Sequence, residues 1–212
     1  MATSTTPTYL RRYTDIPALL HLLTAQQITL LDPKTWDDKN DSYFMSVYKD
    51  KKKLKTVLAL CFSQSPETYH HWRVFSNGPA GVCVVFDRQA LLRDLHKVGG
   101  VVTQAVDYLL LTQAKRRKFL VKDLPFLKRS GYKPENEFRA VYESPGKELA
   151  ALPIPIQLSS IRSISLSPWM HSSLSDTTAS AIRAINGCAK LRVSRSTLIS
   201  NEQWKRYAAG AT

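Results

Sequence analysis

Glycine-rich loops and metal-binding motifs are missing from this sequence of 212 residues, and each absence excludes a class of protein. Its eight glycines form neither of the familiar phosphate-binding loops, which argues against an ordinary NTPase, kinase or Rossmann dehydrogenase. It contains no His-Glu-x-x-His and no Cys-x-x-Cys. The adjacent His70 and His71 would point about a hundred degrees apart on a helix and could not chelate one ion together. We therefore predict no metal site.

Cysteine is also scarce, with Cys61, Cys83 and Cys188 far apart in apolar surroundings. Such residues are typical of reduced thiols in a core rather than of a disulfide framework. No apolar run approaches the roughly eighteen residues of a membrane span. The first residues lack a basic region followed by an apolar segment, so we expect no secretory signal. These features together predict a cytoplasmic protein that does not enter a membrane.

Acidic residues are outnumbered, because 30 Lys and Arg face 17 Asp and Glu and give a net charge of +13. An excess of this size attracts polyanions, and nucleic acid first among them. We expect nucleic acid or a nucleic-acid-bound protein as the partner, although a solvated helix face is the commoner reason for a basic cluster. The clusters are Lys51-Lys52-Lys53, Lys115-Arg116-Arg117-Lys118 and Lys128-Arg129. The second and third of these are the predicted nucleic-acid contacts.

No repeat, linker or low-complexity segment divides the chain, so residues 1–212 are predicted to form a single domain with residues 1–8 flexible. Strands and helices are mixed without strict alternation. The fold class is therefore α+β, with a mixed or antiparallel sheet flanked by helices. Predicted strands cover 28–31, 56–63, 81–86, 101–108, 135–142, 154–158, 161–166 and 190–193. Predicted helices run from the cap Thr14-Asp15 to 26, from 65, and over 42–52, 88–98, 109–122, 175–185 and 196–207.

Acids and an arginine alternate in the stretch Glu135-Asn-Glu-Phe-Arg139. On an extended chain Glu135, Glu137 and Arg139 share one face, and the two carboxylates lie about 7 Å apart, where each raises the proton affinity of the other. Arg139 can hold Glu137 ionised and fix its rotamer. This arrangement suits an acid that stabilises developing positive charge. The alternative is the charged solvent face of an edge strand.

Two further segments carry polar groups that suit a binding site. Ser63 ends the apolar strand 56–63, a position at which small-molecule sites form, while Ser63 or Ser65 could instead cap the next helix. No Gly-x-Ser-x-Gly surrounds it, so a hydrolase nucleophile is not expected. In Tyr9-Leu-Arg-Arg-Tyr13 an arginine could meet a phosphate and a tyrosine could stack on a base. Trp72 is expected in a pocket wall or in the core.

Several of these segments, in this order, resemble the large bacterial domain-of-unknown-function family numbered 2971. The sequence differs from that family at Tyr132, where tryptophan is usual, and at Lys39, where proline is usual. The matching segments are Leu10 to Thr14, Trp36 to Asp41, Cys61-Phe-Ser63 followed by Trp72, Gly81 to Asp87, Lys128 to Tyr132, Glu135 to Arg139, and Ile161 to Ser196. The resemblance covers most of the chain and implies no activity by itself.

A more distant resemblance is to ADP-ribosyltransferases of the Arg–Ser–Glu type. It implies that Arg12, or alternatively Arg11, grips the phosphates of a dinucleotide and that Ser63 orders its nicotinamide side. It also implies that Glu137 stabilises the oxocarbenium-like ribose, and that Glu135 orients or deprotonates the acceptor. A carboxylate in this role counters positive charge as in glycoside hydrolysis. The implied co-substrate is NAD, and the implied fold is ADP-ribosyltransferase-like.

Nicotinamide also needs aromatic walls, for which Tyr13, Trp72 and Phe75 are the candidates. The first hypothesis is therefore an NAD-dependent ADP-ribosyltransferase, a toxin or phage-defence effector acting on nucleic acid or a nucleic-acid-associated protein. The alternative is a non-enzymatic, basic nucleic-acid-binding module. A regulatory protein with a vestigial pocket is a third hypothesis. A nuclease using Asp37, Asp38, Asp41 and the glutamates as Mg²⁺ ligands is a fourth, which no spacing singles out.

Overall fold

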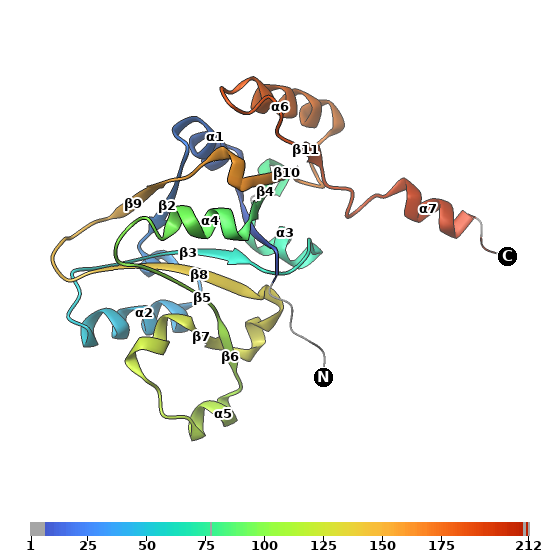
Figure 1. Cartoon of the computed structure of the whole chain (residues 1–212). Helices are drawn as coiled ribbons and strands as arrows, with labels where there is room; N and C mark the ends of the chain where they lie inside the picture. The colour runs from blue at the N-terminus through green and yellow to red at the C-terminus, as the bar shows by residue number, and fades with distance from the viewer. Residues whose placement is uncertain (1–6, 77, 210, 212) are drawn as a thin grey trace.

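The fold is a large mixed sheet with helices on its faces, seen in a computed structural model that describes residues 7–76, 78–209 and 211 (Figure 1). Its strands are β1 Tyr9–Asp15, β2 Gln27–Leu31, β3 Thr56–Ser63, β4 Gly81–Asp87, β5 Val101–Ala105, β6 Asp107–Leu109, β7 Leu127–Arg129, β8 Glu137–Ser144, β9 Ala151–Pro155, β10 Ile161–Leu166 and β11 Val193–Arg195. Its α-helices are α1 Ile16–Ala25, α2 Lys39–Lys51, α3 Tyr69–Phe75, α4 Arg88–Leu95, α5 Leu111–Arg116, α6 Ser172–Ala184 and α7 Glu202–Ala209.

The main sheet has the strand order β11-β10-β4-β1-β3-β2-β9, with β8 pairing beside β3 and β5 beside β8. All of its pairs are antiparallel except β10 with β11. The short strands β6 and β7 form a separate parallel pair. The predicted α+β class is confirmed, because the sheet is mixed, mainly antiparallel and flanked by helices.

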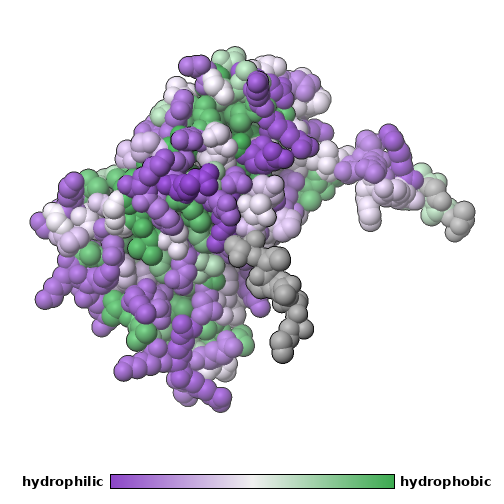
Figure 2. Space-filling model, viewed as in Figure 1, coloured by the Kyte–Doolittle hydropathy of each residue, from purple (hydrophilic) through white to green (hydrophobic). Residues whose placement is uncertain are grey.

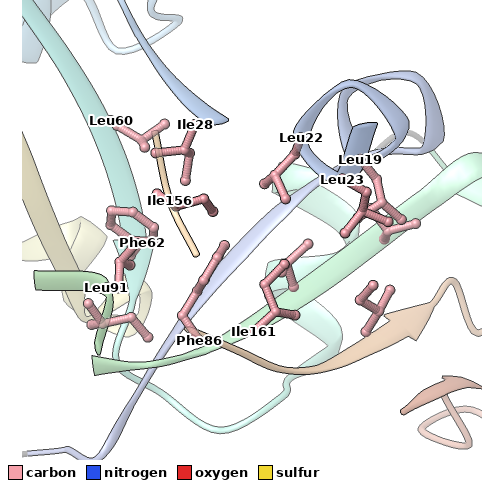
Figure 3. Packing of buried hydrophobic residues seen from close by; sticks show 14 of the residues in the cluster. Leu19, Leu22, Leu23, Ile28, Leu60, Phe62, Phe86, Leu91, Ile156 and Ile161 are labelled. Carbon is pink, nitrogen blue, oxygen red and sulfur yellow. The ribbon is translucent and has the colours of Figure 1, made fainter. Parts of the chain in front are cut away.

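Strand β3 lies between two apolar clusters, which is why its sequence is an almost continuous apolar run. Leu58, Leu60 and Phe62 face the main core, where Figure 3 shows Leu60 near Ile28 and Phe62 near Leu91. Val57 and Ala59 face a second cluster with Met45 of α2. Because side chains alternate across a strand, Cys61 and Ser63 continue this second face to the end of β3.

The start of α1 illustrates how local sequence fixes an element. Asp15 accepts a hydrogen bond from the backbone N–H of Ala18, at 2.9 Å, and Pro17 occupies the first turn. The helix ends at Gln26, which adopts a left-handed conformation with φ of 50°. Its apolar stripe places Leu19, Leu22 and Leu23 in the main core (Figure 3). This helix was predicted correctly at both ends.

The segment between β5 and β8 lies below the sheet in Figure 1, together with α2. It contains β6, α5, the 3-10 turn Val121–Phe126, β7 and the 3-10 turn Ser130–Glu135. The prediction of one helix over 109–122 was wrong, since α5 ends at Arg116. Four consecutive cations would repel one another on a continued helix, and Arg117 instead reaches Asp107 of β6 at 2.6 Å.

Two other strand boundaries, at β1 and at β8, differ from the prediction. The residues from Tyr9 to Asp15 form a strand, which pairs with β4 along its whole length, although no strand was predicted there. Strand β8 starts at Glu137 rather than at Glu135, because Pro134 lies in a 3-10 turn and Asn136 ends that turn with a φ of 45°. Glu135 is thus outside the strand.

The two ends of the chain differ in what surrounds them. Of the predicted flexible segment 1–8, residues 1–6 lie outside the described residues. At the other end, α7 projects away from the body in Figure 1 and has no buried residue. Figure 2 shows this arm as mixed hydrophilic and pale residues rather than a green patch. Among the helices of the described residues, none combines the length and the apolar character needed to cross a membrane.

Candidate active site

The candidate site is a cavity of about 570 Å³ at a fork in the main sheet. One edge of β3 is shared by two strands: β2 meets it where Leu31 pairs with Ala59, and β1 meets it where Arg11 pairs with Ser63. Between these two points, residues 60–62 pair with neither strand in the described part of the chain, and they line the cavity. The volume lies in the range of ligand-binding sites, about 300–1,000 Å³.

A buried network of charged groups forms the floor of this cavity. Arg139 is fully buried, and it donates to Glu137 through Nε at 2.6 Å and Nη2 at 3.0 Å. The same guanidinium binds both oxygens of Asp41, at 2.8 and 2.5 Å. Lys128 lies 2.7 Å from Glu135, 3.3 Å from Glu137 and 3.5 Å from Asp41. Three carboxylates from separate elements are thus held together by two cations, as buried charges require.

This network sets the protonation of the two predicted catalytic acids in opposite directions. Burial favours the neutral form of Glu137, but the charge and hydrogen bonds of Arg139, helped by Lys128, outweigh it and lower the pKa of Glu137 to about 2. Burial raises the pKa of Glu135 above its ordinary value, although Lys128 opposes the change. Burial likewise raises the pKa of Asp41. Glu137 is therefore an ionised carboxylate at neutral pH.

The backbone of Glu135 is fixed by a second set of hydrogen bonds. Its carbonyl oxygen accepts from the Ser63 hydroxyl at 2.9 Å and faces Nε2 of His71 at 3.0 Å. Since a carbonyl only accepts, His71 carries its proton on Nε2, and its Nδ1 accepts from Thr68 at 2.5 Å. Burial lowers the pKa of His71, which favours this neutral form. Ser63 and His71 therefore anchor the loop that carries Glu135.

The positions of Ser63 and Glu137 follow from strand register. The two residues are directly opposite each other in the antiparallel pair of β3 with β8, and both line the cavity. The sequence predicted both strands but did not predict this pairing. The contact of His71 with Glu135 was not predicted either, because it depends on the packing of α3 beside Ser63.

Arg11 and Arg12 both line the cavity, and the structure distinguishes them. Arg11 donates to the backbone oxygen of Ser65 at 2.8 Å. The guanidinium of Arg12 makes no hydrogen bond or ion pair within residues 7–76, 78–209 and 211. Arg12 is half-buried, and this burial lowers the pKa of its guanidinium. Arg12 is therefore the better placed of the two to receive an anion.

Aromatic side chains form part of the wall, although they are not all the predicted ones. Tyr13 lines the cavity and stacks on the ring of His71, with centroids 5.4 Å apart. Trp72 is fully buried and does not line the cavity; its edge supports Tyr13 from behind at 5.3 Å. Phe75, Tyr132 and Trp36 also line the cavity, and Trp36 lies over the guanidinium of Arg139. Trp36 was missed as a wall residue, although it belongs to one of the segments that carry the family resemblance.

The predicted nucleic-acid contacts separate into exposed and buried residues. Lys115, Arg116, Lys118 and Arg129 are exposed, and Arg117 pairs with Asp107 and Asp123. The expectation for Lys128 needs correction, because its side chain is only 9% exposed and is engaged by three carboxylates. It cannot act as a surface contact for phosphate.

The aspartates suggested as Mg²⁺ ligands also line the cavity, but Asp41 already forms an ion pair with Arg139. Across the ranges that the structure covers, no group of three His, Cys, Asp or Glu residues is arranged to hold a metal ion.

Comparison with known proteins gives matches among solved structures alone. No family model and no curated protein matches the chain, so the resemblance to the family numbered 2971 stays a prediction. Similar structures include Thermus sp. 2.9 DarT in complex with ADP-ribosylated ssDNA, with 13% identity and a TM-score of 0.46 over 92% of this chain and 96% of that one. They also include the complex of that protein with NAD⁺, with 14% identity and a TM-score of 0.46 over 92% and 98% of the two chains. The complex with carba-NAD⁺ has 13% identity and a TM-score of 0.44, over 91% and 97%.

Proposed function

We propose that this protein is an NAD-dependent ADP-ribosyltransferase whose active site is the cavity at the fork between β1 and β2. The observation that carries the proposal is the arrangement of charge in this one cavity. Arg12, a half-buried cation without an ion-pair partner in the described chain, and Glu137, a carboxylate held ionised, line the same space. A ligand with a negative group and a centre that becomes positive during reaction would suit both.

NAD has these two properties. Its pyrophosphate is anionic, and loss of nicotinamide leaves positive charge on the ribose carbon that carried it. In the proposed orientation Arg12 binds the pyrophosphate, and Glu137 lies beside the nicotinamide ribose. Tyr13 and Phe75 supply flat and apolar surface for the nicotinamide ring. Ser63 keeps the loop of Glu135 attached to the sheet while substrate enters and leaves.

The reaction exchanges one bond at the ribose for another. The bond from the ribose carbon to nicotinamide breaks, its electron pair leaves with nicotinamide, and the acceptor forms a new bond to the same carbon while losing a proton. Glu137 stabilises the intervening positive charge and does not take the proton, because Arg139 engages both of its oxygens and lowers its pKa. Glu135 has the raised pKa of the pair and is the proposed proton acceptor.

The acceptor is proposed to be nucleic acid or a protein bound to it. This proposal is supported by the net charge of +13 and by the exposed cations Lys115, Arg116, Lys118 and Arg129. Roles as a toxin or phage-defence effector, and a cytoplasmic location, stay predictions from the sequence.

The test is nicotinamide release from NAD by the full chain and by Glu137→Gln, measured chromatographically. We expect the variant to lose at least about a hundred-fold in rate, as enzymes do when a group that stabilises developing charge is removed. It should bind NAD with little change, because Arg12 is untouched. The matched control is Glu143→Gln, the same substitution on the same strand at a residue bonded to Tyr48 and Lys52. Equal rates in Glu137→Gln and Glu143→Gln would refute the proposal.

The non-enzymatic alternative makes a different prediction for the same samples. A simple nucleic-acid-binding module would release no nicotinamide, and its affinity for oligonucleotides would fall steeply with salt and not respond to NAD. Labelled NAD incubated with separate pools of protein, DNA and RNA would then identify the acceptor if the enzyme is active.

A further inference from the structure

A second, smaller cavity of about 170 Å³ adjoins the first. The two share Asp38, Asp41 and Lys128 in their walls, so these side chains lie between them. Lys128 in turn contacts both Glu135 and Glu137. Whatever occupies the second cavity therefore lies next to the charged floor of the proposed active site.

The walls of this second cavity are mainly apolar and come from α2, β6, α5, β7 and the loop after α5. They include Phe44 of α2, Leu109 of β6, Leu111 of α5 and Phe119. Phe119 meets Phe44 edge to face, with ring centroids 6.1 Å apart. Both Leu111, which is 66% exposed, and Phe119, which is 38% exposed, remain open to solvent. A cavity of roughly 150 Å³ lined by apolar side chains accepts one six-membered ring, so a single planar ring fits here.

The rim of the same cavity is strongly basic. Lys115, Arg116 and Lys118 lie on the short segment between the lining residues Leu111 and Phe119, and they are exposed. Arg129 is exposed and lines the cavity itself. Their side chains make no ion pair in the ranges that the structure describes. An aromatic, apolar hollow with exposed cations on its lining segment, and with the half-buried Asp38 as a carboxylate in its wall, is complementary to a base whose flanking phosphates reach those cations.

We propose that the second cavity is a binding subsite for one unpaired nucleobase of a single-stranded nucleic acid. Phe119 stacks on the base, Leu111 covers its edge, and the cations of the rim hold the flanking phosphates. A base in a duplex could not enter, because it would have to leave its stack. Only the role of this strand as the acceptor of ADP-ribose rests on the proposed function, since binding of the strand itself needs no NAD.

The test is fluorescence anisotropy with labelled single strands of DNA and RNA, the matching duplexes, and a strand with abasic sites, over a range of salt. Phe119→Ala should weaken binding of single strands about ten-fold, because stacking of one base on an aromatic side chain is lost. It should leave duplex affinity and the salt dependence unchanged. Leu120→Ala alters the next residue, which is 46% exposed and does not line the cavity, and is the matched control.

Further variants distinguish contacts with the base from contacts with the phosphates. Leu111→Ala should weaken binding of single strands, while Leu110→Ala, at an exposed neighbour outside the cavity, should not. Arg116→Gln should instead weaken single strands and duplexes alike and reduce the salt slope by about one unit. The affinity of the wild type for a strand with abasic sites should be no higher than the affinity of Phe119→Ala for a normal strand.

The subsite is refuted if Phe119→Ala and Leu120→Ala have equal effects, if Phe119→Ala weakens duplexes as much as single strands, or if the abasic strand binds normally. It is also refuted if the wild type binds no strand at all and NAD label appears on protein, since the cavity would then suit a protein side chain. Nicotinamide release by Phe119→Ala should equal that of the wild type. Failure of the proposed enzyme activity would therefore leave this binding test intact.

Discussion

The free energy of unfolding should depend on pH in a way that reports whether Glu137 is buried and ionised. The pKa of Glu137 falls from an ordinary 4.5 to about 2 in the folded protein. A carboxylate with a depressed pKa stabilises the fold above the unfolded pKa, and this contribution is lost as the pH falls from about 4.5 to about 2. A change of 2.5 units corresponds to about 3 kcal/mol in the free energy of unfolding.

The assay is urea unfolding of wild type and Glu137→Gln at pH 5, 4, 3 and 2, followed by fluorescence of the four tryptophans. Glu137→Gln is expected to be less stable at pH 5, because it leaves Arg139 with one carboxylate instead of two. Wild type should lose about 3 kcal/mol more than the variant between pH 5 and pH 2. The variant Glu148→Gln, at an exposed residue, should follow wild type. Parallel pH profiles for wild type and Glu137→Gln would refute the assignment of Glu137 as a buried, ionised group.

Three further predictions address other parts of the site. Arg12→Gln should raise the Kd for NAD by about ten-fold or more, because a charge-assisted contact is lost. Arg11→Gln should have a smaller effect, since Arg11 already donates a hydrogen bond to the backbone oxygen of Ser65. Calorimetric titration of both variants with NAD checks this prediction. His71→Gln should loosen the loop of Glu135, because it removes a hydrogen bond to the Glu135 carbonyl. It should therefore slow transfer to an acceptor more than it slows nicotinamide release, and it should change the pH profile of transfer. Equal slowing of both steps with an unchanged pH profile would indicate a purely structural role. Removal of the chain after Ser200 should leave the melting temperature unchanged, because α7 buries no residue; a clear drop would show that the arm packs on the body.

Much of the fold could be predicted because local sequence determines it. The buried strand at residues 56–63 was recognised from its apolar run, and the helix after Asp15 from its cap and proline. Strand β1 was missed because Leu10-Arg-Arg-Tyr13 lacks a simple alternation of apolar and polar residues. It is a strand because it fits between β4 and the end of β3, which is a property of the whole sheet.

The site was predictable to a smaller extent, because it depends on contacts between distant segments. Glu137 and Arg139 are close in sequence, so their pairing followed from strand geometry. Asp41 comes from α2, 98 residues away, and only the folded chain brings it to Arg139. Lys128 looked like part of a surface cluster, since sequence alone does not show that three carboxylates enclose it. Trp72 could face either the cavity or the core, and packing against Tyr13 decided between them.

A crystal structure of Glu137→Gln soaked with NAD would show directly where the dinucleotide binds, and this variant is chosen because it should bind NAD without consuming it. We predict density for NAD in the fork between β1 and β2, with the pyrophosphate at Arg12 and the nicotinamide ribose beside residue 137. A dinucleotide bound elsewhere, or one bound with its adenine end at residue 137, would contradict it.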